Sequence, residues 1–358
     1  MERIVVKIGS NVLTTRDGGL DTTRMSAIVD QVSSLVSEGI QVVLVSSGAV
    51  ASGRREISPS RRLDSVQSRQ LFSAVGQVRL INRYYDLFRD KGITIGQVLT
   101  MKESFSTRSH YLNQRACIEV MLGNGVLPIV NENDTVSVTE LMFTDNDELS
   151  GLVATMTGAD LLVILTNVDG VYNGDPSEEG TSIIRRINPG EDLSGFVKAG
   201  RSEFGRGGMI TKSGIASKLA SEGIRVVIAN GRRDNILLDI LHDPDNVPFT
   251  EFVPGESSSG VKKWVAHSGG FAKGWVTIDR KARETLLGPK AASLLFVGVK
   301  SIEGDFEEGD ILSIRDEDGG QIALGKSEFS SERAKALVGR HGEKPLVHYD
   351  FLFTEEES

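Results

Sequence analysis

Two lysines beside glycine-rich turns are the first residues in this 358-residue sequence that could do chemistry. Lys7 closes a short apolar run and precedes Gly9 and small polar residues, whereas Lys212 follows the glycine-rich segment 205–208 at the start of a predicted helix. Glycine lets backbone amides approach a phosphate closely, and a helix N-terminus attracts anions. The two segments therefore indicate phosphate binding, with a point charge from each lysine. Taken singly, the first also fits an edge strand before a plain turn, and the second fits an ordinary surface loop.

Two further regions carry polar side chains directly after apolar runs. Ser46-Ser47-Gly48-Ala49-Val50 has the small residues that let backbone NH groups face an anion, although an ordinary strand-to-helix connection explains it too. The segments 131–134 (Asn-Glu-Asn-Asp) and 144–148 (Thr-Asp-Asn-Asp-Glu) bring carboxylates and amides beside apolar strands, where burial without partners would be costly. They suit recognition of an amino group, of a magnesium-associated water or of lysines. The alternative is a solvated acidic loop that caps a helix.

The segment 320–327, Gly-Gln-Ile-Ala-Leu-Gly-Lys-Ser, matches the phosphate-binding P-loop pattern G-x-x-x-x-G-K-[ST] at every position. Its middle residues, however, alternate polar and apolar like those of a strand, and too little chain follows to build the rest of a P-loop nucleotide-binding core. We therefore predict that it forms one arm of a hairpin that turns at Asp318 and Gly319.

The elements that must position these turns alternate between two hydrophobic patterns over about the first 240 residues. Apolar runs predict buried strands, and apolar residues at helical spacing predict helices between them, the first capped by Asp21 and ended by Gly39. Buried strands joined by helices imply a mainly parallel central sheet covered on both faces, which is a three-layer α/β sandwich. We expect strands at 3–8, 41–45, 94–99, 127–130, 161–165 and 225–229, and further helices at 66–88, 111–121, 149–156 and 211–222.

A Gly-, Pro- and Ser-rich stretch at 251–260 and shorter elements beyond it mark a second domain. There we expect strands near 274–278, 294–299, 311–314 and 321–324 and a helix near 281–287, which together make a small β-rich barrel or roll. The expected division of the chain is an α/β domain at 1–256, a linker at 257–268, a β-rich domain at 269–350 and an acidic tail at 351–358.

Composition narrows the classes of function. The formal net charge of −9 argues against a protein that lives on nucleic acid or on anionic membranes. The single cysteine, Cys117, excludes an internal disulfide and paired-cysteine zinc sites, and with no signal-peptide pattern at the start we expect a cytoplasmic protein. The five histidines lack helical metal-ligand spacing, which argues against metalloprotease chemistry, and no apolar run approaches the ~20 residues of a membrane-spanning helix.

In order along the chain, the candidate segments resemble those of the amino-acid kinase family. The matching stretches are VVKIGSNVL from Val5, VLVSSGAVASG from Val43, AVGQVRL from Ala74, PIVNENDTV from Pro128, TDNDELSG from Thr144, LTNVDGVY from Leu165 and GRGGMITK from Gly205. The pair VNENDTV and TDNDELSG is similar to the glutamate-phosphorylating subfamily rather than to kinases of aspartate, acetylglutamate or UMP. The region from about Gly269 to His348 resembles a PUA domain, which many bacterial members of that subfamily carry.

The resemblance implies transfer of a phosphoryl group from MgATP to the γ-carboxylate of L-glutamate, which yields L-glutamyl 5-phosphate and ADP in the first step of proline synthesis. It assigns catalysis to Lys7 and Lys212, held by Asp147, and glutamate binding to Ser47, Asp134 and Asn146. The residues that it assigns to ATP are Lys7, Thr166, Asn167, Arg206, Gly207, Gly208, Met209, Ile210, Thr211 and Lys212. Asn167 and Arg206 depart from the family, which often has an aspartate and a small residue at these positions.

The residue types agree with that reaction on chemical grounds. Charge spreads over the equatorial oxygens of a phosphoryl transition state, so two lysines from different strand ends would stabilise it. A glutamate carboxylate has a reference pKa of about 4.3, so it is already ionised and needs no general base. Because Asp134, Asp145 and Asp147 would repel anionic substrates, we expect a magnesium requirement, with no direct protein ligand assigned.

Two other functions stay open at this point. One is a sibling kinase for another carboxylate or for a nucleoside monophosphate. The other is an RNA-binding module, because PUA domains elsewhere contact RNA. The stretch 264–358 contains 12 Lys and Arg against 17 Asp and Glu, which argues against RNA binding by this domain. The family resemblance further implies a homo-oligomer, dimeric or tetrameric, and feedback inhibition by proline.

Overall fold

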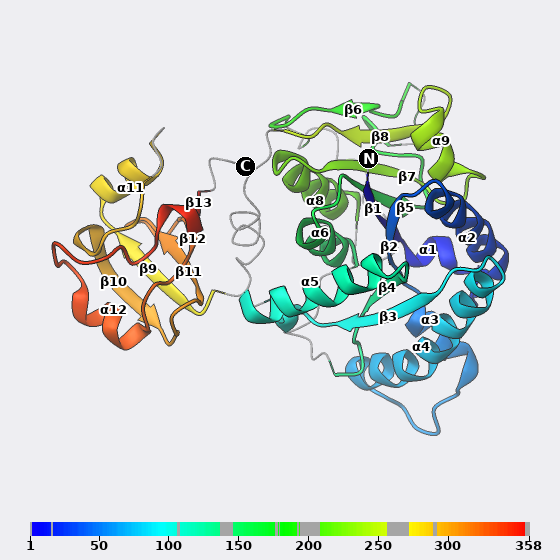
Figure 1. Cartoon of the computed structure of the whole chain (residues 1–358), viewed down its shortest axis with the longest axis horizontal. Coiled ribbons are helices and arrows are strands. Elements are labelled where there is room, and N and C mark those ends of the chain that lie inside the picture. Colours follow the sequence, from blue (N-terminus) through cyan, green and yellow to red (C-terminus); the bar gives the residue numbers. More distant parts are fainter. Residues whose placement is uncertain are drawn as a thin grey trace. The chain divides into compact units, whose positions relative to one another are not determined.

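A computed structural model describes residues 2–15, 17–105, 108–136, 146–175, 178, 180–191, 193, 208–255, 272–288 and 292–354. The chain divides into two compact units, one formed by Met1–Lys102 with Arg115–Ser257 and the other by Ser258–Ser358 with Glu103–Gln114. Each unit has its own β-sheet (Figure 1). Within the described ranges, no helix is both long enough and apolar enough to cross a membrane.

An eight-stranded sheet forms the centre of the first unit, in the order β3-β4-β2-β1-β5-β7-β8-β6. Neighbouring strands from β3 through β7 all run parallel, whereas β8 is antiparallel to β7 and parallel to β6. The mainly parallel sheet predicted from the uninterrupted apolar runs is therefore confirmed. The strands are β1 (Arg3–Ile8), β2 (Gln41–Val45), β3 (Ile95–Thr100), β4 (Leu127–Glu132), β5 (Leu161–Thr166), β6 (Arg186–Ile187), β7 (Arg225–Asn230) and β8 (Phe249–Phe252).

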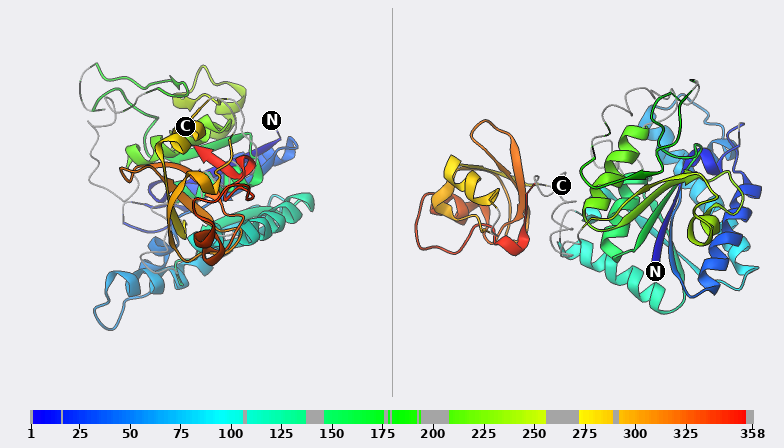
Figure 2. Two further views of the ribbon diagram at one scale, coloured as in Figure 1. Left: turned by 90° about the vertical axis from the view of Figure 1, so that its left-hand side faces the viewer. Right: turned by 90° about the horizontal axis from the view of Figure 1, so that it is seen from above.

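Helices cover both faces of this sheet and complete the predicted three-layer sandwich (Figure 2). Helices α2, α4 and α9 pack on one face, where their apolar side chains join those of β1, β2 and β5 in a continuous core. Helices α6 and α8 contact each other and the strands of the other face. The helices of this unit are α1 (Ser10–Leu13), α2 (Thr22–Ser37), α3 (Ala49–Glu56), α4 (Ser65–Arg89), α6 (Asn146–Thr157), α8 (Met209–Ser221) and α9 (Ile236–His242). Two further elements, η1 (Lys102–Phe105) and α5 (Arg108–Gly123), include residues assigned to both units.

Helix α2 shows how local sequence fixes the bounds of an element. The Asp21 side chain accepts a hydrogen bond from the Arg24 backbone amide at 2.9 Å, as an N-cap does. Beyond the last turn, Gly39 adopts a φ of 86°, a left-handed conformation that glycine takes without strain and that ends the helix. The buried apolar residues between these signals are Met25, Ile28, Val29, Val32 and Leu35.

The second unit is built on a five-stranded sheet in the order β10-β9-β11-β12-β13. Only β9 and β11 pair in parallel; the other neighbours are antiparallel, so the expected small β-rich domain is confirmed. Its apolar core lies between this sheet and the short helices. The elements are β9 (Gly274–Ile278), α11 (Arg280–Leu286), η4 (Phe296–Gly298), β10 (Val299–Gly304), β11 (Ile311–Arg315), β12 (Gln321–Lys326), α12 (Ser331–Leu337), η5 (Tyr349–Phe351) and β13 (Leu352–Thr354).

The segment that matches the P-loop pattern is a strand, as predicted. Its residues lie in β12, which pairs with β11 through a tight turn at 316–320. Gly319 has a φ of 84° in that turn, and the Asp316 side chain accepts a hydrogen bond from the Gly320 amide at 2.8 Å. The Ser327 hydroxyl is fully buried and donates to the Phe329 carbonyl at 2.7 Å, so its hydrogen bond stays within the protein.

Two expectations for the second unit are wrong. The apolar run at 294–299 is not one strand, because it forms the 3-10 helix η4 before β10 begins. Phe296 is buried in that turn. A short apolar run does not show whether its residues are buried in a strand or in a helical turn. The acidic tail expected from residue 351 begins later, because Leu352 and Phe353 are buried in β13 against β12.

The predicted boundary between the domains is tested only at its start. Glu251 and Phe252, which begin the Gly- and Ser-rich stretch, belong to β8 rather than to a linker. Phe252 is 1% exposed, and Glu251 Oε1 lies 2.6 Å from Arg225 Nε, so both side chains are held by the sheet. The predicted linker at 257–268 lies outside the described residues.

Candidate active site

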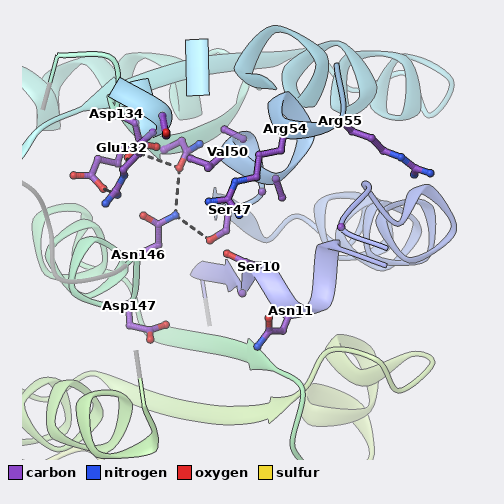
Figure 3. A pocket seen from close by; sticks show the side chains of 18 of the residues that line it. Ser10, Asn11, Ser47, Val50, Arg54, Arg55, Glu132, Asp134, Asn146 and Asp147 are labelled. Atoms are coloured by element: carbon purple, nitrogen blue, oxygen red, sulfur yellow. Dashed lines mark hydrogen bonds and ion pairs between the residues drawn. The ribbon is translucent and has the colours of Figure 1, made fainter. Parts of the chain in front are cut away.

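A cavity of about 1170 Å³ lies where β1, β2, β4 and β5 end at their carboxyl edge. These strands are neighbours in the sheet, and β1 lies between β2 on one side and β5 on the other. Ligands of open parallel sheets bind at such a reversal of strand order, because the loops leave the strands in opposite directions and form a crevice. Figure 3 shows the polar side chains that these loops and the adjoining helices contribute.

One buried carboxylate holds two lysines in this cavity. Asp147 Oδ1 lies 2.5 Å from Lys7 Nζ, and Asp147 Oδ2 lies 2.9 Å from Lys212 Nζ. The exposed fractions are 0% for Asp147, 5% for Lys7 and 9% for Lys212. The three residues predicted as catalytic, which we call the lysine trio, are thus brought together from distant parts of the chain.

The element that carries each member of the lysine trio fixes its position. Lys7 belongs to β1, which is paired with β2 and β5 on its two sides, whereas Asp147 and Lys212 lie in the first turns of α6 and α8. The positive end of a helix dipole favours an acidic residue in the first turn and disfavours a lysine there. The position of Lys212 therefore needs a compensating contact, and Asp147 supplies it.

The lysine trio keeps its carboxylate ionised despite complete burial. Burial raises the pKa of Asp147, but the charges and hydrogen bonds of Lys7 and Lys212 outweigh that effect, so the pKa lies below its usual range. With two ammonium groups and one carboxylate, the trio has a formal charge of +1. A site of this sign attracts a polyphosphate or a carboxylate.

The predicted glutamate-binding residues Ser47 and Asn146 are joined by hydrogen bonds. Asn146 donates from Nδ2 to the Ser47 hydroxyl at 2.9 Å and to the Ser46 carbonyl at 2.9 Å (Figure 3). The same amide lies 3.3 Å from Asn131 Oδ1, and Asn131 donates to Gln77 Oε1 at 2.8 Å. This network fixes the end of β2 relative to the start of α6, so the hydroxyl and the amide have set orientations before any ligand binds.

Glycines shape the wall of the cavity between β2 and α4. Gly48 adopts a φ of 102°, a left-handed conformation that lets the chain turn from β2 directly into α3. At Gly53 and at Gly76, an added Cβ would overlap the backbone of the facing helix. Helices α3 and α4 therefore approach closely, and they bring Arg54 and Arg69 to the cavity.

A second charged cluster lies on another wall of the cavity, and Asp134 is part of it. Arg69 Nε lies 2.6 Å from Asp134 Oδ1, and Arg69 Nη2 lies 2.9 Å from Glu132 Oε2. We call these three side chains the arginine trio. Burial raises the pKa of Asp134 above its ordinary value, although the charge of Arg69 and hydrogen bonds from Arg69 and Ser73 oppose that shift.

The residues predicted to bind ATP are only partly described. Thr166 is the last residue of β5 and lines the cavity, with 8% of its surface exposed. Its hydroxyl lies 3.3 Å from Oδ1 of Asn167, which is an exposed residue. Gly208 is the N-cap of α8, so the first amides of that helix lie next to Lys212. Met209, Ile210 and Thr211 form its first turn, with Ile210 62% exposed. Arg206 and Gly207 lie outside the described residues.

The carboxylates of the cavity suit a metal ion that is bound mainly by substrate phosphates better than one that is bound by the protein alone. Among the described residues, no group of three His, Cys, Asp or Glu side chains is placed to hold a metal. Both oxygens of Asp147 already face lysines. Magnesium commonly keeps several waters and takes one or two protein carboxylates together with substrate phosphates, and this donor set is compatible with that arrangement.

Sequence reasoning missed several residues that line the cavity. Ser10 and Asn11 follow β1, and the sequence indicates them only as small polar residues of a turn, whereas nothing in the sequence singles out Arg54 or Arg69. Glu132, the last residue of β4, belongs to an acidic segment that the sequence marks without indicating a role for this residue. The arginines carry no local signal, because an arginine on a helix looks like any solvated residue until the facing strand is known.

Comparisons with known proteins agree with this geometry. Residues 2–230 match the amino acid kinase family, and residues 274–349 match the PUA domain. The chain is 60% identical to a glutamate 5-kinase of Bacteroides thetaiotaomicron, over 99% of this chain and 98% of that protein. It is 46% identical to a glutamate 5-kinase of Chlorobaculum tepidum, over 98% and 97% of the two chains, and 39% identical to one of Streptomyces coelicolor, over 98% and 96%. The chain therefore belongs to the amino acid kinase family, in its glutamate 5-kinase group, and carries a PUA domain.

Proposed function

We infer that this protein phosphorylates the γ-carboxylate of L-glutamate with ATP, which forms L-glutamyl 5-phosphate and ADP in the first step of proline biosynthesis. The observation that carries this inference is the lysine trio. It places two ammonium groups on one buried carboxylate at the carboxyl edge of a parallel sheet, beside a cavity of about 1170 Å³. That volume is ample for a nucleotide and an amino acid together.

The lysine trio suits phosphoryl transfer in particular. Charge on the transferring group spreads over its equatorial oxygens, so cations that are already in position stabilise it without reorganisation. Lys7 and Lys212 are held in this way by Asp147, and we propose that they contact the transferring group. A glutamate carboxylate is ionised at neutral pH and attacks without a general base, because its reference pKa is about 4.3.

We propose that glutamate lies between the two charged trios. Asp134 offers a carboxylate for the substrate ammonium, and the Ser47 hydroxyl and Asn146 amide offer polar contacts nearby. Burial of an ammonium without a partner would be costly, so the acidic wall fixes which end of the amino acid points towards it. The distal carboxylate then points away from Asp134 and towards Lys7 and Lys212.

We propose that ATP binds along Thr166, Asn167 and the segment from Arg206 to Lys212. The first turn of α8 supports this assignment, because its backbone amides and Lys212 lie at one helix N-terminus. A kinase that uses ATP needs a divalent metal, and we propose that the metal is Mg²⁺ bound to the nucleotide phosphates. When bound, it would neutralise phosphate charge and polarise the transferring group.

The proposed substrate is tested by a comparison of four acceptors. Purified protein is incubated with ATP, Mg²⁺ and either glutamate, aspartate, N-acetylglutamate or UMP, and ADP release is measured. We expect release with glutamate alone, together with a product that hydroxylamine converts to a hydroxamate, and no release when EDTA removes the metal. Preference for another acceptor would contradict the proposed function.

Other expectations from the sequence and from the resemblance stay predictions. They are the cytoplasmic location, the dimeric or tetrameric assembly, feedback inhibition by proline and the lack of RNA binding by the PUA domain. The domain limits and individual residue roles are likewise proposals, which the experiments below address.

A further inference from the structure

The arginine trio joins one helix to the end of one strand inside the substrate cavity. Arg69 lies in α4, and its side chain is 28% exposed, whereas the side chains of Glu132 and Asp134 are 2% and 8% exposed. Two different nitrogens of one guanidinium reach the two carboxylates, at 2.6 Å for Asp134 and 2.9 Å for Glu132. All three residues line the cavity. Figure 3 shows Glu132 and Asp134 close together beside Asn146.

We propose that Arg69 is a positioning residue for the amino-acid substrate, which keeps Asp134 ionised and turned so that it can accept the substrate ammonium. This inference rests on the proposed function, because it takes Asp134 as the partner of the ammonium. The rigid fork of a guanidinium can hold two carboxylates in fixed positions, which a lysine's single charged nitrogen does less well.

The need for a cation follows from the burial of two acids two positions apart. Both carboxylates contact the same guanidinium, and burial disfavours their charged forms, so without this cation Asp134 would take up a proton more readily. Among the described residues, Arg69 and the Ser73 hydroxyl from α4 contact Asp134, and Glu132 of β4 binds the same guanidinium. Arg69 is the cation in this set. The trio alone has a formal charge of −1, the sign that attracts one ammonium.

A purely structural role for Arg69 makes a different prediction. If the arginine only ties α4 to β4, its loss should weaken folding and should change the KM values for glutamate and ATP together, equally at every pH. If it keeps Asp134 ionised, its loss should raise the KM for glutamate selectively and more strongly as the pH falls. The reason is that a carboxyl with a raised pKa becomes neutral, and loses its hold on the ammonium, below that pKa.

The test compares Arg69→Gln, Arg69→Lys and Asp134→Asn with wild-type protein in steady-state kinetics from pH 5.5 to pH 8.5. Arg89→Gln is the matched control, because Arg89 lies in the same helix and pairs with Asp86 on the surface, outside the cavity. Thermal unfolding of each variant shows whether it is folded. Over this pH range the substrate carboxylates stay ionised.

We expect Arg69→Gln to raise the KM for glutamate about tenfold or more at pH 7, since a buried charge pair loses one partner. The KM for glutamate should rise further towards pH 5.5. The KM for ATP should stay within about twofold of wild type, because Arg69→Gln removes no contact to the nucleotide. Asp134→Asn should raise the KM at every pH, and Arg69→Lys should restore most of the wild-type pH profile. The double variant Arg69→Gln/Asp134→Asn should be little worse than Asp134→Asn alone, because the two residues act as one unit.

Equal pH profiles in Arg69→Gln and wild type, or parallel increases in both KM values, would overturn the inference. If Arg69→Gln does not fold, the KM of Asp134→Asn still tests the inference, because an unchanged KM for glutamate in that variant refutes it. Failure of wild-type protein to phosphorylate glutamate would instead refute the proposed function, so the two failures are distinguishable.

Discussion

Replacement of Asp147 by asparagine should disable the site and destabilise the fold at the same time. Asp147→Asn keeps the shape of the side chain but removes the charge that holds two ammonium groups. Those groups belong to side chains that are 6% exposed for Lys7 and 11% exposed for Lys212, so neither is well placed to find water instead. One amide oxygen can still accept a hydrogen bond from one lysine, but the amide nitrogen meets the other lysine donor to donor.

The magnitude follows from the burial of all three charges. Removal of one partner from a buried ion pair typically costs about 3–5 kcal/mol, because the remaining charge is left uncompensated. For a unit of this size, that loss corresponds to a fall of roughly 6–20 °C in Tm. Loss of a single preorganised donor elsewhere lowers kcat by about 10²–10³, and here two donors lose their anchor, so we expect kcat to fall by at least about 10².

The pH dependence provides a separate check on the same contact. Because the pKa of Asp147 is lowered in the folded protein, its carboxylate contributes stability that is fully present above the unfolded value of about 3.9. That contribution is lost as the pH falls through the lowered pKa. The difference in stability between wild type and Asp147→Asn should therefore be largest near neutral pH. It should begin to shrink below about pH 4 and should vanish only below the lowered pKa, where both proteins carry an uncharged side chain at this position.

The assay combines steady-state kinetics with thermal unfolding of the full chain at several pH values. Asp30→Asn is the matched control, because Asp30 also pairs with a lysine, Lys91, but with side chains 52% and 45% exposed. An exposed pair contributes at most about 1 kcal/mol, so the control should keep both its Tm and its kcat. If Asp147→Asn retains kcat within about tenfold and loses less than about 1 kcal/mol, the lysine trio is not the catalytic centre.

Three further predictions follow from the two units. Lys7→Met and Lys212→Met should each lower kcat by about 10²–10³ and raise the KM for glutamate far less, because their charge acts on the transition state; kcat within about tenfold of wild type in both would remove them from the mechanism. Lys326→Met should leave kcat unchanged, because Lys326 lies in β12 of a P-loop-like segment that forms a hairpin; a loss of activity in folded protein would give this lysine a catalytic role. A chain truncated after Lys263 should fold and still release ADP with glutamate, since every described residue of the cavity precedes that point; a folded but inactive fragment would show that the PUA unit contributes to catalysis.

Much of the fold was predictable because its signals are local. The strand β1 and the helix α2 are each defined by a short stretch with its own start and stop, such as Asp21 and Gly39. Lys7 and Lys212 could be singled out for the same reason, because each stands beside glycines within a few residues. Their common partner Asp147 came from the family resemblance, since no spacing in the sequence relates it to either lysine.

The arginine trio could not be predicted because its contacts are long-range. Arg69 is separated by 63 and 65 residues from its two partners, and nothing near it in the sequence marks it as part of a site. Its neighbours in α4 follow the pattern of an ordinary amphipathic helix. Only the close packing of α3 on α4, which Gly53 and Gly76 permit, brings this guanidinium to the end of β4. Such a residue becomes visible when topology is known, because topology decides which strand end faces which helix.

The two trios together give the cavity an electrical polarity that a single cluster could not provide. The lysine trio has a formal charge of +1 and the arginine trio −1, and the carboxylates of both are buried. Glutamate carries its ammonium and α-carboxylate on one carbon and its γ-carboxylate at the far end, so in the proposed binding mode the two trios would favour the orientation that places the γ-carboxylate, and not the ammonium, beside the lysines. We propose that in this orientation the ammonium contacts Asp134 and the γ-carboxylate contacts Lys7 and Lys212. The charge distribution proposed to bind glutamate would therefore also direct its nucleophilic carboxylate towards the phosphoryl group.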